Sequence, residues 1–92
     1  MPVPGGELEE QVVRIAGVLA ESGVQRLVWN SAGVLQEFVA RETDLPGLLR
    51  DAPVGAFLVC EALGVAIHKS PDGLTWKGST PDAAARFAER LG

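Results

Sequence analysis

The sequence is poor in cysteine, histidine and aromatic residues. It contains one Cys, one His and no Tyr, and its aromatic residues are two Trp and three Phe. A single Cys cannot form an internal disulfide, and one Cys with one His cannot supply the ligands of a zinc site. We therefore expect a core of aliphatic side chains in a reduced, cytoplasmic protein that holds no metal and no other cofactor.

Long apolar runs and clusters of positive charge are also missing. No apolar run approaches the roughly 18–20 residues that a membrane-spanning helix needs, and the first residues lack the basic and apolar regions of a signal peptide. The net charge is −4, and the eight Lys and Arg residues are scattered along the chain. Because basic patches supply most of the affinity for nucleic acid, we expect neither nucleic acid nor a membrane as a partner.

Enough apolar residues are present for one folded domain. Hydrophobic residues make up 47% of the 92 residues and charged residues 22%, a balance that disordered chains do not show. The first six residues, MPVPGG, contain two Pro and two Gly, which oppose regular structure. We expect a flexible N-terminal lead-in at residues 1–6 and a single α/β domain at residues 7–92.

Helix and strand signals alternate along the domain. Apolar residues at helical spacing, helix caps and turn residues mark the boundaries. The expected elements are a helix at 7–22, a strand at 24–29, a helix at 32–41, a short helical segment near Pro46, a strand at 54–60, a β-hairpin at 65–78 and a helix after Thr80.

This order, α-β-α-β-β-β-α, predicts an α/β fold. Three main helices would accompany a small mixed sheet of about four strands. The first two strands would be parallel neighbours joined by a right-handed crossover. A C-terminal β-hairpin followed by a helix would complete the fold.

Cys60 is the first candidate for chemistry. It ends the most apolar predicted strand, at the kind of sheet edge where ligands and reactive groups collect in parallel α/β folds. A helix beginning there would lower the pKa of the thiol. The alternative is that Cys60 is a buried small hydrophobic residue, and the adjacent Glu61 also opposes a thiolate.

Two further groups are candidate binding residues. His68 and Trp76 lie on the predicted hairpin, where they would form a small recognition surface if they were cross-strand neighbours. The structural alternative packs Trp76 on a helix and leaves His68 at the surface. Asn30 and Ser31 precede the predicted helix at 32–41, so they either help a helix N-terminus to hold an anion or act only as its cap.

Residues 27–64 resemble DsrE-type sulfur-relay proteins. The resemblance rests on a strand leading into Ala32-Gly33-Val34 and on a later strand that ends in Val59-Cys60-Glu61-Ala62-Leu63. It implies a small, often oligomeric α/β protein in which a cysteine after a central strand carries persulfide sulfur. Cys60 matches that cysteine.

Two functional hypotheses follow from these observations. Nucleotide-binding, hydrolase, metalloprotease and calcium-binding motifs are all absent. The leading hypothesis is therefore a protein-interaction or regulatory domain without catalytic activity, which binds a protein partner or a copy of itself. The alternative is a thiol-dependent persulfide carrier that uses Cys60.

Overall fold

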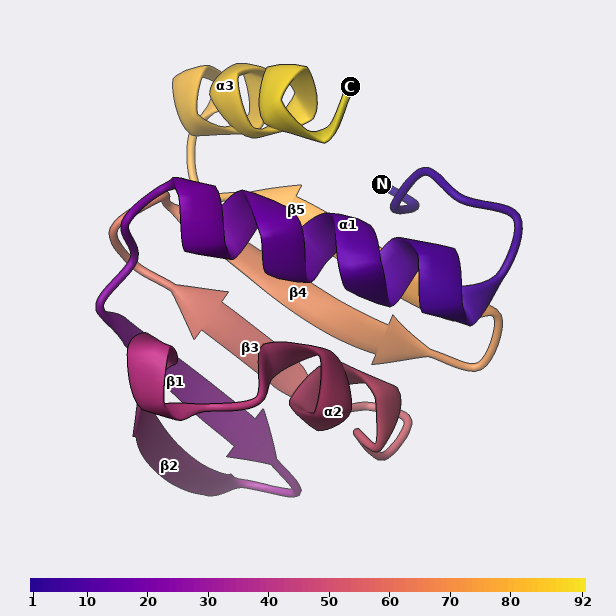
Figure 1. Cartoon of the computed structure of the whole chain (residues 1–92), viewed down its shortest axis with the longest axis vertical. Helices are drawn as coiled ribbons and strands as arrows, with labels where there is room; N and C mark the ends of the chain where they lie inside the picture. Colours follow the sequence, from indigo (N-terminus) through magenta and orange to yellow (C-terminus); the bar gives the residue numbers. More distant parts are fainter.

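Three α-helices accompany a five-stranded antiparallel sheet in the computed structural model, which describes residues 1–92 (Figure 1). The strands lie in the order β2-β1-β3-β4-β5. No helix is both long and apolar enough to cross a lipid bilayer. In chain order the elements are α1 (Leu8–Glu21), β1 (Arg26–Ser31), β2 (Val34–Val39), the 3₁₀ helix η1 (Ala40–Glu42), α2 (Leu45–Arg50), β3 (Phe57–Cys60), β4 (Val65–Ser70), β5 (Gly73–Gly78) and α3 (Pro81–Leu91).

The first and last helices and the C-terminal hairpin confirm their predictions. The α1 helix ends before Gly23, which adopts a φ of 68° that suits a residue just beyond a helix. The α3 helix begins with Pro81, and the Thr80 hydroxyl accepts a hydrogen bond from the Ala83 N–H at 3.1 Å. The β4–β5 hairpin precedes α3 as expected.

The predicted helix at 32–41 is wrong. Residues Val34–Val39 form β2, which pairs with β1 in an antiparallel hairpin. The turn consists of Ala32 and Gly33, with φ angles of 51° and 80°. Positive φ at both central residues is the geometry that matches the twist of a two-residue hairpin. The spacing of the apolar residues at 34, 35, 38 and 39 fits a helix as well as a strand, so the pattern alone was ambiguous.

The extra hairpin also corrects the predicted sheet. A mixed sheet of about four strands was expected, and the structure contains five strands that are all antiparallel. The β2 strand brings the chain back to the end of the sheet where β1 began. The segment with η1 and α2 then leads to the other end, so β3 runs in the opposite direction to β1. The β1 and β3 strands are therefore antiparallel neighbours, with Val28 opposite Val59. The crossover through η1 and α2 joins β2 to β3, which run parallel to each other on either side of β1.

The core lies between the helices and one face of the sheet. Along β4, Val65, Ile67 and Lys69 are buried while the alternate residues are only half-buried, which is the pattern of a sheet covered on one side. The indole of Trp76 on β5 contacts the ring of Phe87 on α3, with ring centroids 5.0 Å apart. The helices thus form a single layer, and the opposite face of the sheet has no covering element.

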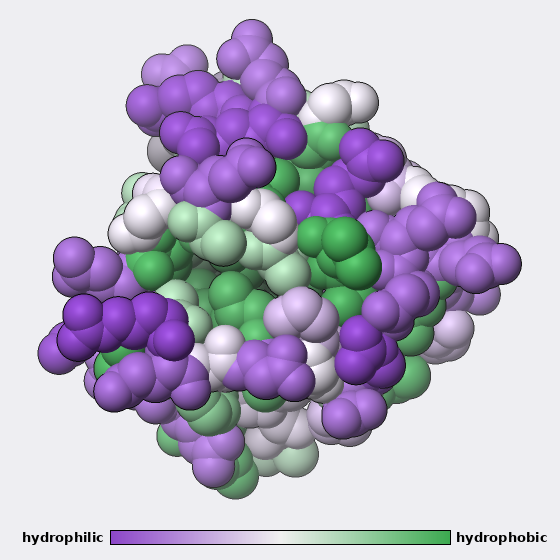
Figure 2. All heavy atoms as spheres, in the orientation of Figure 1, coloured by the Kyte–Doolittle hydropathy of each residue, from purple (hydrophilic) through white to green (hydrophobic).

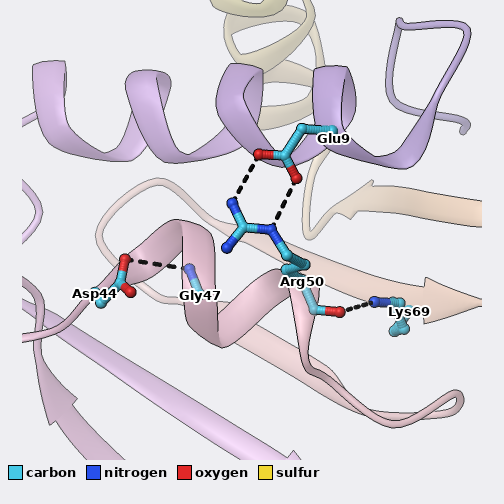
Figure 3. A network of polar contacts seen from close by, with 5 residues as sticks. All are labelled: Glu9, Asp44, Gly47, Arg50 and Lys69. Carbon is cyan, nitrogen blue, oxygen red and sulfur yellow. Dashed lines mark hydrogen bonds and ion pairs between the residues drawn. The ribbon is translucent and has the colours of Figure 1, made fainter.

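Hydrogen bonds and an ion pair connect α2 to α1 and to β4 (Figure 3). Asp44 caps its start by accepting a hydrogen bond from the Gly47 N–H at 3.2 Å. At its end, the buried Lys69 ammonium donates to the carbonyls of Leu49 and Arg50, each at 2.9 Å. The Arg50 guanidinium also donates two hydrogen bonds to the Glu9 carboxylate on α1, and it holds the pKa of Glu9 below its ordinary value.

The first residues of the chain pack along β5. The backbone N–H of Trp76 donates to Met1 O at 2.7 Å, and the backbone N–H of Val3 donates to Leu74 O at 2.9 Å. The buried Gln11 amide on α1 completes this edge, because it accepts from Leu74 N–H and donates to Val3 O, each at 2.9 Å. Residues 1–6 were expected to be a flexible lead-in outside the domain, but Val3 is a core residue.

Replacing Gln11 with Leu should destabilise the fold. The substitution keeps a similar volume but leaves the Leu74 N–H and the Val3 carbonyl without partners in a buried place. We expect the free energy of unfolding to fall by about 1–3 kcal/mol, measured by urea denaturation. The exposed Gln25 supplies a matched control, since Gln25→Leu breaks no side-chain hydrogen bond. Equal stability of the two variants would contradict this role for Gln11.

Replacing Ala32 with Asn tests the hairpin turn. A non-glycine residue is strained at positive φ, and Asn tolerates this conformation better than Ala. We expect Ala32→Asn to raise the free energy of unfolding by roughly 0.5–1 kcal/mol. A helix at 32–41 would respond in the opposite way, because Asn has a lower helix propensity than Ala. A decrease in stability would therefore argue against the turn.

Candidate functional site

The uncovered face of the sheet carries two rows of side chains. Strand pairing sets each row, because directly opposed residues project to the same face. The first row is Leu35, Asn30, Phe57, His68 and Thr75. The second row is Glu37, Val28, Val59, Ala66 and Lys77. We call these ten residues the open face.

His68 lies on the open face between Phe57 of β3 and Thr75 of β5. Its ring stacks on Phe57 with centroids 4.5 Å apart, and its Nδ1 lies 3.4 Å from the Thr75 hydroxyl. Trp76 pairs with Ile67 and is buried under α3, so it projects from the other face of the sheet. His68 and Trp76 therefore do not form the shared recognition surface that the sequence suggested.

Asn30 and Ser31 belong to β1 and are half-buried. Asn30 faces Leu35 and Phe57 within the first row of the open face. The expected anion site depended on a helix beginning at residue 32, and the chain forms a hairpin turn there instead. No helix N-terminus is present beside these two residues.

Cys60 lies on the helix-covered side of β3 and is completely buried. Burial raises the pKa of its thiol, although backbone hydrogen bonds from Leu63 and Ala62 act in the opposite direction. The residues between β3 and β4 form a turn, so no helix begins beside the sulfur. A buried thiol with a raised pKa has the properties of a small apolar side chain rather than of an activated nucleophile.

The β2 strand is the most exposed element of the sheet. It pairs with β1 on one side and with no strand on the other. Leu35 is 67% exposed, Val34 60% and Val39 40%, so apolar side chains point into solvent from both faces of the strand. The Arg26–Glu37 ion pair, with 3.1 Å between its N and O atoms, is the charged contact of this region.

The two edges of the sheet differ in whether another segment of the chain covers them. The edge at β5 is occupied by Met1–Val3 and by the Gln11 side chain. The edge at β2 is open over its whole length. Unpaired backbone groups on an edge strand form a template for another strand, and natural proteins usually blunt such edges. We call the outer side of Val34–Val39 the β2 edge.

A hollow opens on the helix side of the molecule, between α1 and the segment that contains η1 and the start of α2. Figure 2 shows hydrophobic side chains at its bottom. Its volume is about 450 Å³, and small residues of α1 form one wall, among them Ala16, Gly17 and Ala20. A second recess of about 520 Å³ shares Ala20 with it and reaches Val39 at the end of β2.

The side chains that could take part in a reaction do not lie close together. Cys60 lies under the helices, whereas His68 lies on the open face. The β2 edge was not among the predicted sites, and the only local signal for its hairpin was Gly33 before the apolar residues Val34 and Leu35. Comparisons with protein-family models, with curated proteins and with solved structures found no match for this chain.

Alkylation of Cys60 should be slow in the folded protein. Burial both blocks the reagent and raises the pKa of the thiol, so the thiolate is scarcer at pH 8 than for a free cysteine. We expect iodoacetamide to react at least roughly tenfold more slowly in native buffer than in denaturant.

A matched control moves the thiol to the other face of the same strand. In a Cys60→Ala background, Val59→Cys places it on the open face, because neighbouring residues of a strand project to opposite faces. This variant should react faster than the native protein. A fast native reaction of Cys60, with an apparent pKa below that of a free thiol, would favour the persulfide carrier instead.

Proposed function

We propose that this chain is a protein-interaction domain that binds by accepting an additional strand at the β2 edge. One observation carries the proposal: β2 exposes its outer backbone groups together with the apolar side chains of Val34, Leu35 and Val39. Main-chain hydrogen bonds supply the affinity in strand addition, and alternate side chains supply the specificity.

The contrast with the other edge supports this proposal. The chain uses three of its own residues and the Gln11 amide to occupy the edge at β5. The β2 edge has neither a covering segment nor a Pro, and Glu37 is the only charged residue of the strand. An apolar, uncovered edge strand would be an aggregation hazard unless a partner occupies it.

The persulfide carrier remains the second proposal. The backbone N–H groups of Leu63 and Ala62 point toward Cys60 and favour its thiolate, which is the feature that supports this activity. Burial opposes it and is the larger effect on the pKa. A carrier would require an opening motion that exposes the sulfur, and the native alkylation rate measures that exposure.

Site-specific photo-crosslinking in cells of the source organism tests the interaction. A benzophenone amino acid replaces Leu35 on β2 in one variant and the exposed Lys77 on β5 in the other. We expect covalent protein adducts from position 35 and far fewer from position 77, since only the first position borders an open edge. Mass spectrometry of the adducts identifies the bound protein.

Equal adduct yields at the two positions, or no adduct at position 35, would overturn the proposed function. Circular dichroism of both purified variants checks that the fold survives, which is expected because both side chains are exposed.

A further inference from the structure

We propose that the strand added at the β2 edge is the β2 strand of a second copy of this chain, in an antiparallel two-fold pairing centred on Gln36. The inference rests on the proposed function of the β2 edge and names its occupant. The pairing would join the two sheets into one continuous sheet, with the helices of both copies on the same side.

The backbone groups available for this pairing can be assigned. Ala40 N–H donates to Gln25 O at 2.9 Å, next to the β1–β2 register. Hydrogen-bonded pairs alternate along an antiparallel ladder, so Val34, Gln36 and Phe38 direct their N–H and C=O groups toward β1. Leu35, Glu37 and Val39 therefore direct theirs outward.

The two-fold geometry restricts the register. Two copies of one edge strand are antiparallel only when the axis is perpendicular to the sheet, and directly opposed side chains then share a face. The axis must therefore pass midway between one residue and the same residue of the second copy, so that these two residues are directly opposed. An axis at Gln36 places Leu35 opposite the second copy's Glu37, and both residues have outward-pointing backbone groups.

Charge separates this register from the one centred on Glu37. An axis at Glu37 would place the two Glu37 carboxylates directly opposite each other, and like charges in that position are destabilising. An axis at Gln36 removes this direct opposition and makes the two Glu37 side chains diagonal neighbours, which lie farther apart. Each Glu37 stays beside its own Arg26. The two Gln36 amides then face each other and can exchange hydrogen bonds.

Apolar packing favours the same register. With the axis at Gln36, Val34 opposes the second copy's Phe38 on the helix side of the sheet. Val34 is 60% exposed in a single copy, and Phe38 is a partly buried residue at the border of the core. Both belong to non-hydrogen-bonded pairs, in which side chains approach most closely.

The closed edge at β5 limits the assembly to two copies. Each chain has one free edge, because Met1–Val3 and Gln11 occupy the other. Once two β2 edges have paired, no edge remains for a third copy, so the contact is closed rather than fibre-forming. A single pair of short strands is a small interface, and we expect a dissociation constant in the micromolar range or weaker.

Two charge variants at one position test the register. In the Gln36-centred dimer, Leu35→Lys places an ammonium opposite the second copy's Glu37, whereas Leu35→Glu places a carboxylate there. Sedimentation equilibrium should give dissociation constants that differ on the order of tenfold, with the Lys variant tighter. The same two substitutions at Val54, which is 62% exposed in a loop, control for net charge. These two variants should have equal dissociation constants. Equal constants for the two Leu35 variants would overturn this register.

A cysteine at the axis tests the geometry directly. In a Cys60→Ala background, Gln36→Cys should form an intermolecular disulfide, since a non-hydrogen-bonded pair brings Cα atoms to about 4.5 Å. Leu35→Cys is the matched control, because its two copies would lie about 8 Å apart. Crosslinking of Leu35→Cys as fast as Gln36→Cys would contradict the proposed register.

Separate measurements test the dimer and the β2 edge as a binding site. If the native chain stays monomeric up to about 1 mM, a concentration at which even weak pairing is populated, the second copy is not the occupant. Photo-crosslinking from position 35 to a different protein would then retain the β2 edge as the binding site. Absence of both the dimer and the crosslink would refute both proposals.

Discussion

The backbone conformation of the Ala32-Gly33 turn is the constraint on which the architecture depends. Both residues adopt positive φ, which brings β2 back along β1 with the twist of a two-residue hairpin. This reversal makes the next strand, β3, antiparallel to β1. It also leaves β2 at the rim of the sheet, with its outer backbone groups unpaired. The antiparallel pairing of β1 with β3 and the position of β2 at the rim of the sheet therefore both accompany this turn.

The single helix layer accounts for the contrast between the two faces of the sheet. Most residues of β3, β4 and β5 that project toward the helices are buried, and they include Cys60, Trp76 and Lys69. A thiol in that layer packs like a small hydrophobic side chain, and Lys69 is retained there because carbonyls at the end of α2 accept its hydrogen bonds. Residues that project the other way, such as Phe57 and His68, remain partly in contact with solvent.

Both edge strands, β5 and β2, have outward-facing backbone groups that need hydrogen-bond partners, and the chain supplies partners at β5 only. At β5, the chain supplies donors and acceptors from Met1–Val3 and from the buried Gln11. At β2 it supplies none, and apolar side chains accompany the open backbone. In a two-fold pairing centred on Gln36, Val34 of each copy would stand opposite Phe38 of the other, and this apolar match makes the edge of a second copy a suitable occupant.

The sequence by itself determined the elements whose signals are local. Thr80 and Pro81 predicted the start of α3, helical spacing of apolar residues predicted α1, and the turn residues at 70–73 predicted the β4–β5 hairpin. Only the tertiary structure decided the conformation of residues 32–39, because their apolar spacing fits both a helix and a strand. Burial of Cys60, the separation of His68 from Trp76 and the openness of the β2 edge were decided in the same way. Each depends on which face or edge of the sheet other segments cover, and contacts between distant residues determine that coverage.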